Sequence, residues 1–314
     1  MISCFADRLI TAIQDKKSPV IVGLDPHHEK LLEIYPHASL MDAEAFAEIV
    51  RHFCLDVIKT VHDLIPAVKV QLALFERLGA SGLAVLEEIV TFAHQQGLLV
   101  ISDSKRGDIG VIASAYAGYH LGTIPGQEDT HLGGLGADAM TVNPYFGTDT
   151  LKPFDPYLKH AKGIWVLART TNPGASVLHD VTVSHSGMQQ PLYEYIADIV
   201  MQNHKDYSGQ YGYSAVGLVV SVQNQQAAQR LRRRFPSVFF LLPGIETQGL
   251  SLEDTRICFN QDGLGAVVSV SRSVLFAYRE AAWVSKHPST CWRDAARWKV
   301  QTIIDSLSHL ITVY

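Results

Sequence analysis

Eight short, β-rich apolar runs alternate with longer segments of helical period, and this alternation constrains the fold more than any other feature of the sequence. The runs cover residues 20–25, 67–71, 98–105, 139–143, 164–170, 216–221, 238–245 and 266–272. Strands that alternate with helices predict a parallel sheet, and eight strands are the number that closes a (β/α)8 barrel, the TIM barrel. An open, doubly wound sheet is the alternative, but VIVGLDPHHEK lacks the GxGxxG turn that usually follows the first strand of such a sheet.

The length of the chain, 314 residues, fits a single barrel domain. We expect the barrel core to span about residues 18–280, and we expect helices in residues 281–314 to pack outside it. Helical periodicity between the strands is clearest at residues 43–64, 80–95, 189–202 and 223–234. Two connecting segments, residues 122–138 and 172–188, are long enough to be binding loops, and the second is our candidate lid.

Composition points away from several classes of partner. The net charge of −5 does not match the basic surface of a nucleic-acid-binding protein. The one basic run, RLRRR at residues 230–234, has an amphipathic helical pattern and predicts a solvated helix face. No apolar run approaches the roughly 20 residues of a membrane span, and the N-terminus lacks the pattern of a signal peptide. The 4 scattered cysteines form no CxxC pair, which indicates a reducing cytoplasm.

The third run ends in charge, in the sequence VISDSKRGDIG at residues 100–110. Asp103 and Lys105 are two positions apart, so a regular strand would direct both side chains to one face. Asp108 follows just beyond the strand. Ionisable groups at the end of an apolar strand are costly to bury unless they are paired. These three residues are therefore candidates for a paired charge network, although such networks can also be purely structural.

Other predicted strands also carry polar residues at or near their carboxyl ends, where the active site of a barrel lies. These residues are Asp25, Lys69, Thr141, Asn143, Arg169, Thr170, Thr171 and Ser271. The last two strands run into Gly244, Gln248, Gly249 and Arg272, in the loops where many barrels bind phosphate. Glycine lets backbone N–H groups approach an anion, and the planar guanidinium of arginine suits phosphate oxygens. The sequence therefore predicts a polar site with a phosphate-binding side.

In order along the chain, GLDP at residues 23–26, the Lys69 strand, DSKRGDI at 103–109, TVNPYFG at 141–147, TNPGA at 171–175, LLPGIETQG at 241–249 and VSVSR at 268–272 together resemble the orotidine 5′-phosphate decarboxylases. The similarity is to the longer bacterial form of that family and runs from about residue 20 to residue 278. The resemblance implies cofactor-independent decarboxylation of orotidine 5′-phosphate to UMP and CO2, the last step of UMP biosynthesis. It also implies a cytoplasmic enzyme that binds neither nucleic acid nor membrane.

The resemblance also implies residue roles. Lys69, Asp103, Lys105 and Asp108 match the family's alternating Lys–Asp–Lys–Asp charge network. Lys105 matches the residue that donates a proton to C6 of the pyrimidine, and Asp108 matches a residue that reaches into the neighbouring subunit's site, which implies a homodimer. The implied substrate contacts are Asp25 and Lys69 at the ribose, Thr171 at the pyrimidine, Gln248 and Arg272 at the phosphate, and in addition Thr141 and Gly249.

Two segments depart from the family pattern, and two other functions stay open. TTNPG at residues 170–174 replaces TSNPG, and PGIETQGL at residues 243–250 replaces PGxGAQGG, which puts the conformation of the phosphate loop in question. One alternative function is a Mg²⁺-dependent sugar-phosphate lyase of the same barrel superfamily, which a chelator would inactivate. The other is a catalytically inactive nucleotide-binding regulator, which would bind a UMP analogue without turnover.

Overall fold

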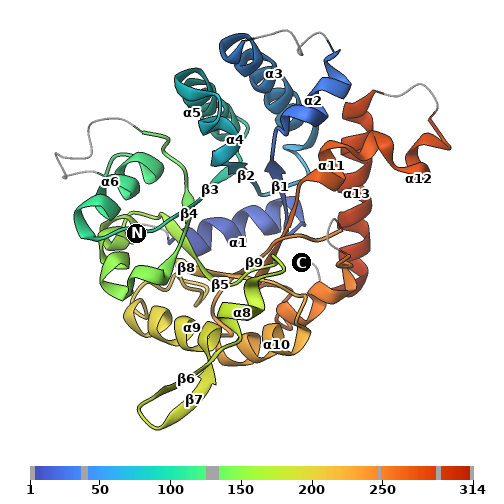
Figure 1. Cartoon of the computed structure of the whole chain (residues 1–314). Helices are drawn as coiled ribbons and strands as arrows, with labels where there is room; N and C mark the ends of the chain where they lie inside the picture. Colours follow the sequence, from blue (N-terminus) through green and yellow to red (C-terminus); the bar gives the residue numbers. More distant parts are fainter. Residues whose placement is uncertain (1–3, 37–41, 125–133, 247–248, 288–290, 312–314) are drawn as a thin grey trace.

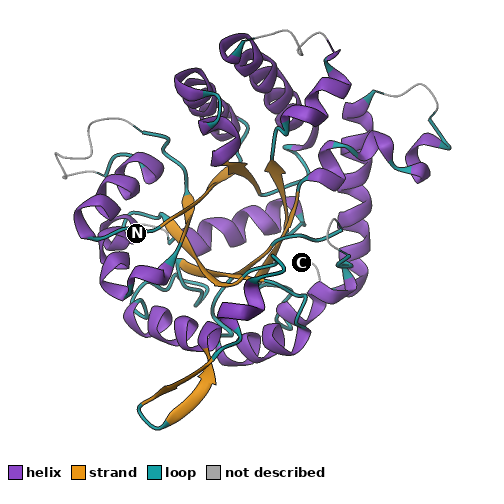
Figure 2. Ribbon diagram, in the orientation of Figure 1, coloured by secondary structure: helices purple, strands orange, loops and turns teal. Residues whose placement is uncertain are grey.

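Eight parallel strands close into a barrel in the order β1-β10-β9-β8-β5-β4-β3-β2, which confirms the predicted (β/α)8 fold (Figure 2). The strands are β1 (Val20–Leu24), β2 (Ala67–Gln71), β3 (Leu99–Arg106), β4 (Ala139–Val142), β5 (Gly163–Arg169), β8 (Val216–Val220), β9 (Phe240–Leu242) and β10 (Ala266–Val270). The computed structural model describes residues 4–36, 42–124, 134–246, 249–287 and 291–311 of the chain. Each strand lies within or close to one of the eight predicted runs.

Burial explains why these runs are apolar almost throughout. Every residue of β1, β4, β8, β9 and β10 is buried. Strands of a parallel barrel are covered on one face by the filled interior and on the other by helices, so they read as continuous hydrophobic runs. Buried charge in the strands is confined to a few positions, of which Lys69 and Asp103 lie near the mouth of the barrel.

Helices surround the barrel on its outside (Figure 1). The longer ones are α3 (Ala43–Val61), α5 (Gly79–Gln95), α6 (Gly110–Leu121), α9 (Leu192–Asn203), α10 (Gln225–Arg234) and α13 (Trp292–Leu310). The shorter ones are α2 (His28–Ile34), α4 (Leu72–Glu76), α7 (Asp155–Leu158), α8 (Ala175–His179), α11 (Arg272–Leu275) and α12 (Ala281–Val284). Asp42 caps α3 by accepting a hydrogen bond from the N–H of Ala45. The C-terminal helix α13 packs against α3 and α11, outside the ring of strands.

The N-terminal helix α1 (Phe5–Lys16) lies across one end of the barrel (Figure 1). Its buried face includes Phe5, Leu9 and Ile13. The ring of Phe5 meets Trp165 edge to face at 6.3 Å and lies directly on Gly163, where a Cβ atom would be only 2.3 Å from the Phe5 ring. Glycine at the start of β5 therefore makes room for this helix, which closes the end opposite the polar site.

The segment at residues 172–188, expected as a loop, contains regular structure. It holds α8 and β6 (Thr182–His185), and β6 forms an antiparallel hairpin with β7 (Met188–Pro191) that projects from the barrel (Figure 1). The sequence predicts residues 189–191 of β7 as the start of a helix, which begins instead at Leu192 as α9. The other long segment, residues 122–138, lies partly outside the described residues. In the described part of the chain, no helix is both long and apolar enough to cross a membrane.

The prediction that RLRRR forms a solvated helix face is wrong for Arg232, which is 6% exposed. Its guanidinium donates to the carbonyl groups of Gly265, Phe235 and Val238 at 3.2, 2.7 and 2.5 Å and lies 3.9 Å from the ring centre of Phe240. Burial lowers the pKa of Arg232 to about 10. The helical period alone could not distinguish this position, because the accepting carbonyl groups lie beyond the end of α10, two of them at Phe235 and Val238 and one 33 residues away at Gly265.

Candidate active site

A cavity of about 230 Å³ opens at the carboxyl ends of the barrel strands. Its lining includes seven of the ten predicted site residues, namely Asp25, Lys69, Asp103, Lys105, Thr141, Thr171 and Arg272. Asp108 and Gly249 do not line it, and Gln248 lies outside the described residues. Most of the polar residues predicted at the ends of the strands therefore line a single cavity.

The carboxylate of Asp103 is the centre of the polar network in this cavity. Its Oδ1 accepts from Lys105 Nζ at 2.5 Å and from Thr141 Oγ1 at 3.0 Å. Its Oδ2 accepts from Lys69 Nζ at 2.8 Å and, with the Gln71 amide nitrogen turned toward it, from Gln71 at 2.9 Å. Four donors, two of them cationic, thus satisfy a carboxylate whose side chain is 9% exposed.

Electrostatics keep this buried network charged. Burial alone would raise the pKa of Asp103, but the ammonium groups of Lys69 and Lys105 outweigh it and hold that pKa well below its usual range. Burial alone would likewise lower the pKa of Lys69, but Asp103 and Asp25 outweigh it and hold that pKa above its usual range. Both members of the pair are therefore ionised at neutral pH.

A bulge in β3 places Asp103 and Lys105 at the cavity. Ser102 pairs with Met140 and Arg106 with Val142, so three residues of β3 lie opposite one residue of β4. Lys105 within this bulge has φ 48°, in the left-handed region. This conformation costs a non-glycine residue about 1–2 kcal/mol, so the surrounding contacts must stabilise it. The two residues therefore do not follow the simple strand alternation that the sequence predicts, although their charged groups still meet.

Asp25 follows β1 and presents an acceptor to the cavity. Its Oδ2 accepts from Ser271 Oγ at 2.5 Å, and Lys69 Nζ lies 3.8 Å from its Oδ1. Among the described residues, no group donates a hydrogen bond to this buried Oδ1. A Cβ atom at Gly23 would lie 2.9 Å from Ser271 Cβ and 3.2 Å from Asp25 Oδ1, so only glycine leaves this corner open. The free lone pairs of Oδ1 suit a hydroxyl group of a ligand.

The predicted phosphate side lies between β9 and β10. Arg272 begins α11 and lines both the cavity and an adjoining groove of about 800 Å³. Gly244 and Gly249 have φ of 81° and 73°, which L-residues rarely adopt. Gly244 lines the cavity, whereas Gly249 is exposed outside it. The cavity and the groove thus share the side chain of Arg272, and Gly244 lies on the cavity side.

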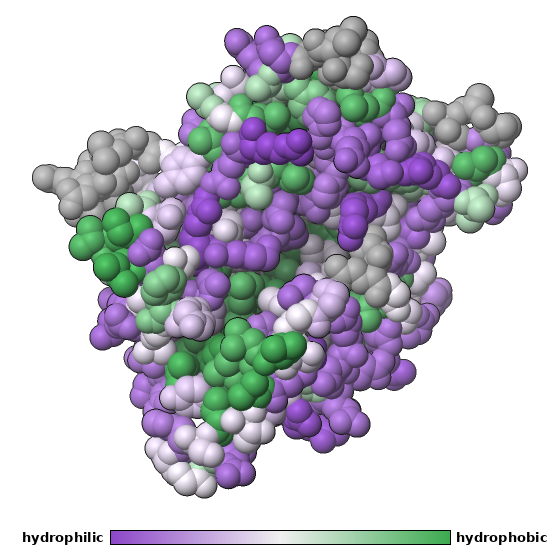
Figure 3. All heavy atoms as spheres, viewed as in Figure 1, coloured by the Kyte–Doolittle hydropathy of each residue, from purple (hydrophilic) through white to green (hydrophobic). Residues whose placement is uncertain are grey.

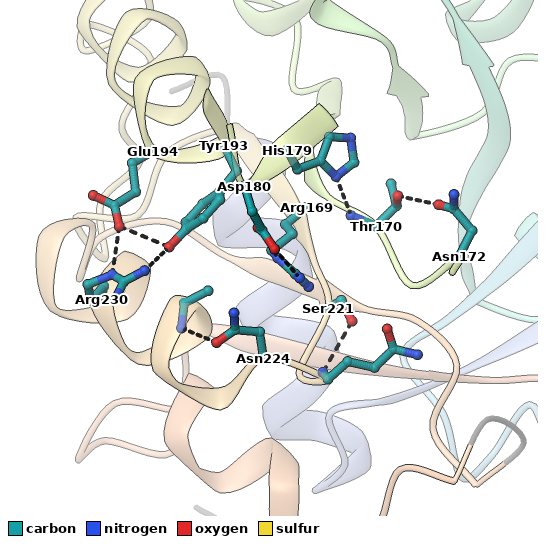
Figure 4. A network of polar contacts seen from close by, with 12 residues as sticks. Arg169, Thr170, Asn172, His179, Asp180, Tyr193, Glu194, Ser221, Asn224 and Arg230 are labelled. Carbon is teal, nitrogen blue, oxygen red and sulfur yellow. Dashed lines mark hydrogen bonds and ion pairs between the residues drawn. The ribbon is translucent and has the colours of Figure 1, made fainter. Parts of the chain in front are cut away.

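Residues at the end of β5 and just after it contact the segment of α8 (Figure 4). Arg169 donates from Nε and Nη2 to the two carboxylate oxygens of Asp180 at 2.9 and 3.0 Å. The N–H of Thr170 donates to Nδ1 of His179 at 3.4 Å. Both contacts attach the α8 segment to the strand that leads directly into Thr171 of the cavity.

Asp108 lies away from the cavity of its own chain, in a small hollow formed with Arg106 and Asn143. Its Oδ1 accepts from the N–H of Ile109 at 2.8 Å. Large apolar side chains near it are exposed: Ile109 63%, Val111 83%, Ile112 44%, Tyr145 78% and Phe146 52%. We call these five residues the Asp108 patch. Figure 3 shows hydrophobic side chains at the edge formed by α6 and a second group over α8.

Two contacts of this site are absent from the sequence-based predictions. Gln71 contacts Asp103, and its position two residues after Lys69 on the same strand was the available signal. The hydrogen bond from Ser271 to Asp25 joins residues 246 positions apart, for which the sequence offers no local signal. Within the described residues, no three His, Cys, Asp or Glu side chains are grouped so that they could hold a metal ion.

Comparison with known proteins relates this site to one family. Residues 18–286 match the family model described as Orotidine 5′-phosphate decarboxylase / HUMPS family. The orotidine 5′-phosphate decarboxylase of Rhodopirellula baltica is 37% identical over 295 residues, which cover 93% of this chain and 95% of that protein. The corresponding protein of Caldicellulosiruptor saccharolyticus is 33% identical over 282 residues, which cover 88% of this chain and 90% of that protein.

Solved structures agree with these sequence matches. The structure of Leishmania donovani OMP decarboxylase has a TM-score of 0.70 and 29% identity, and the match covers 96% of this chain and 98% of that chain. The structure of Leishmania donovani UMP synthase has a TM-score of 0.72 and 30% identity, with coverage of 96% of this chain and 56% of that chain.

Proposed function

The chain belongs to the orotidine 5′-phosphate decarboxylase / HUMPS family, and we propose that it decarboxylates orotidine 5′-phosphate to UMP and CO2. The observation that carries this proposal is the Lys69–Asp103–Lys105 network in the cavity at the mouth of the barrel. It places a fixed ammonium group and a fixed carboxylate side by side, which suits a reaction that moves negative charge from a carboxylate to a carbon atom.

We propose the following placement of the substrate. The phosphate lies at Arg272, where the cavity and the groove meet. The ribose hydroxyl groups contact Asp25 and Lys69. Oδ1 of Asp25 lies 3.8 Å from Lys69 Nζ and accepts no hydrogen bond from the described residues, so it supplies an acceptor for them. The pyrimidine then extends toward Lys105, with Thr171 and Thr141 also lining the space that it would fill.

The chemistry follows from this placement. The bond between C6 and the carboxylate carbon breaks, its electron pair stays on C6, and CO2 leaves. The ammonium of Lys105 stabilises the developing negative charge and transfers a proton to C6, and its amine then regains a proton from solvent. Asp103 holds this ammonium at 2.5 Å and would lie close to the substrate carboxylate. Binding of the remote phosphate supplies the energy that orients the ring.

We also propose that the enzyme is a homodimer in which Asp108 completes the partner's site. Asp108 does not line the cavity of its own chain, and three exposed residues of the Asp108 patch follow it directly in the sequence. Five exposed large apolar side chains beside one carboxylate are unusual for a surface in contact with water and are typical of an interface. A twofold axis through this patch would place each Asp108 near the other chain.

Mixing two inactive variants tests the shared site. Lys105→Ala alters the site of its own chain, and Asp108→Asn alters the site of the partner chain. A hybrid dimer therefore has one doubly altered site and one intact site. Unfolding and refolding an equal mixture should restore about one quarter of the wild-type activity, because half of the dimers are hybrids and each contains one intact site. If the mixture stays as inactive as its components while sedimentation shows dimers, Asp108 acts within its own chain.

The reaction itself is tested by incubating the purified protein with orotidine 5′-phosphate in the presence of a chelator and following the loss of the substrate's ultraviolet absorbance. We expect turnover in chelator and its loss in Lys105→Ala, whose side chain is 43% exposed, so that the fold survives the change. Turnover of a sugar phosphate with Mg²⁺ instead would assign the chain to the lyases. Tight binding of UMP without turnover would make it a regulator.

We propose the cytoplasm as the site of this reaction. The described cysteines Cys4, Cys54, Cys258 and Cys291 are all free thiols, which suits a reducing compartment. Cell fractionation followed by the same absorbance assay tests this, since activity confined to an exported fraction would contradict it.

A further inference from the structure

Thr141 is the single residue of β4 that lies opposite the three-residue bulge of β3. In a regular parallel pair, the backbone of β4 would accept hydrogen bonds from alternate N–H groups of β3. At the bulge the side chain of Thr141 is the acceptor instead: its Oγ1 accepts a hydrogen bond from the N–H of Lys105 at 2.9 Å. The same oxygen donates to Asp103 Oδ1 at 3.0 Å.

The hydroxyl group of Thr141 has the donor and the acceptor that these two partners need. The N–H of Lys105 can only donate, and the ionised carboxylate of Asp103 can only accept. The group between them must therefore accept from one and donate to the other, which serine or threonine can do and valine cannot. Because Thr141 is 1% exposed, solvent does not compete for either contact.

We propose that Thr141 is a positioning residue that holds Lys105 in its left-handed backbone conformation and orients the Asp103 carboxylate toward the lysine ammonium. This proposal rests on the proposed function for its kinetic consequence. It differs from the substrate contact that the sequence resemblance implies for Thr141, since both hydrogen bonds of its hydroxyl group are to catalytic residues of the protein. The role predicts an effect on turnover and not on nucleotide affinity.

The test compares Thr141→Val, which keeps the size and removes the hydroxyl group, with Thr141→Ser, which keeps the hydroxyl group. We expect Thr141→Val to lower kcat by about 10- to 100-fold, as small displacements of a reacting group do, with KM and the Kd of UMP within about threefold of wild type. Thr141→Ser should retain kcat within about threefold of wild type. Crystal structures of both variants should show Lys105 leaving the left-handed region only in Thr141→Val.

Several results would overturn the proposal. An unchanged kcat in Thr141→Val, or an equal loss in both variants, would mean that the hydroxyl group does not position Lys105. An increase in KM at constant kcat would return Thr141 to a substrate-binding role. If the wild-type protein does not decarboxylate orotidine 5′-phosphate, the proposed function fails, and the conformation of Lys105 in the Thr141→Val structure still decides the positioning role.

Discussion

Replacing Asp103 by asparagine removes the negative charge from the centre of the network while keeping the size of the side chain. Lys69 is the residue most affected, because its side chain is 7% exposed and its ammonium lies 2.8 Å from Asp103 Oδ2. A buried ammonium that loses its carboxylate partner is left with an uncompensated charge, because water does not reach it. We therefore expect Asp103→Asn to destabilise the fold as well as to abolish decarboxylation.

The structure sets the size of this effect. At an effective dielectric constant of about 20, the 2.8 Å separation of Lys69 Nζ and Asp103 Oδ2 corresponds to roughly 6 kcal/mol of attraction. The 3.8 Å separation of Lys69 Nζ and Asp25 Oδ1 corresponds to roughly 4 kcal/mol and remains in the variant. Loss of one partner of a buried pair usually lowers the free energy of unfolding by about 3–5 kcal/mol. Because the Asp25 carboxylate remains beside Lys69, we expect a loss near the lower limit, about 3 kcal/mol.

Urea unfolding followed by fluorescence and circular dichroism measures this change, provided that the two transitions coincide. Asp305→Asn on the exposed face of α13 is the matched control and should alter the free energy of unfolding by less than about 0.5 kcal/mol. The pKa of Asp103 is lowered in the folded state, so its stabilisation is present above the unfolded pKa of about 3.9 and is lost as the pH falls below it. The difference between wild type and Asp103→Asn should therefore narrow below about pH 4.

Equal stability of Asp103→Asn and wild type at pH 7 would refute this reasoning, because it would mean that Lys69 does not depend on Asp103 for its charge compensation. A difference that stays constant down to pH 2 would show instead that shape or hydrogen bonding, and not the carboxylate charge, is lost in the variant.

Three further substitutions test features outside the network. Asp180→Asn should lower the free energy of unfolding by about 2–3 kcal/mol in urea, because the guanidinium of Arg169, whose side chain is 7% exposed, loses a charged partner. Arg232→Met should cost about 2–4 kcal/mol in the same assay, because three backbone carbonyl groups lose their donor. Burial lowers the pKa of His120 to about 3, so the wild type should lose roughly 1 kcal/mol of stability per pH unit below the unfolded pKa of about 6.5, and His120→Gln should lack this loss. Unchanged urea midpoints, or an unchanged pH slope for His120→Gln, would contradict these expectations.

The barrel could be predicted because its strands are buried on both faces and therefore appear in the sequence as apolar runs. The hairpin of β6 and β7 could not be found in this way, since most of its side chains are exposed and follow no hydrophobic period. Its turn did leave a local signal. Ser186 and Gly187 have φ of 50° and 79°, the two positive values of a type I′ turn, and a Ser-Gly pair between polar segments was the available clue.

The identities of the site residues could be predicted for a similar reason. Asp25, Lys69 and Asp103 are charged residues at or near the ends of apolar strands, where burial makes them costly unless they have a role. Their contacts could not be predicted to the same extent. The hydroxyl group of Thr141 contacts Lys105 and Asp103, which precede it in the sequence by 36 and 38 positions. These contacts depend on the register between β3 and β4. The hydrophobic pattern specifies which face of each strand is buried, but it does not specify this register.

The bulge also explains why the strand alternation is an incomplete guide to the chemistry. Side chains two apart on a regular strand start about 6.5 Å from each other and run parallel, which keeps an ammonium and a carboxylate from pointing at one another. The left-handed turn at Lys105 breaks this geometry and brings its Nζ to 2.5 Å from Asp103 Oδ1. Lysine has no intrinsic preference for that conformation, so the backbone cost must be offset by the ion pair and by the hydrogen bond to Thr141. Strain held in this way at the cavity fixes the ammonium before a substrate arrives, which is what a reaction stabilised by electrostatics requires.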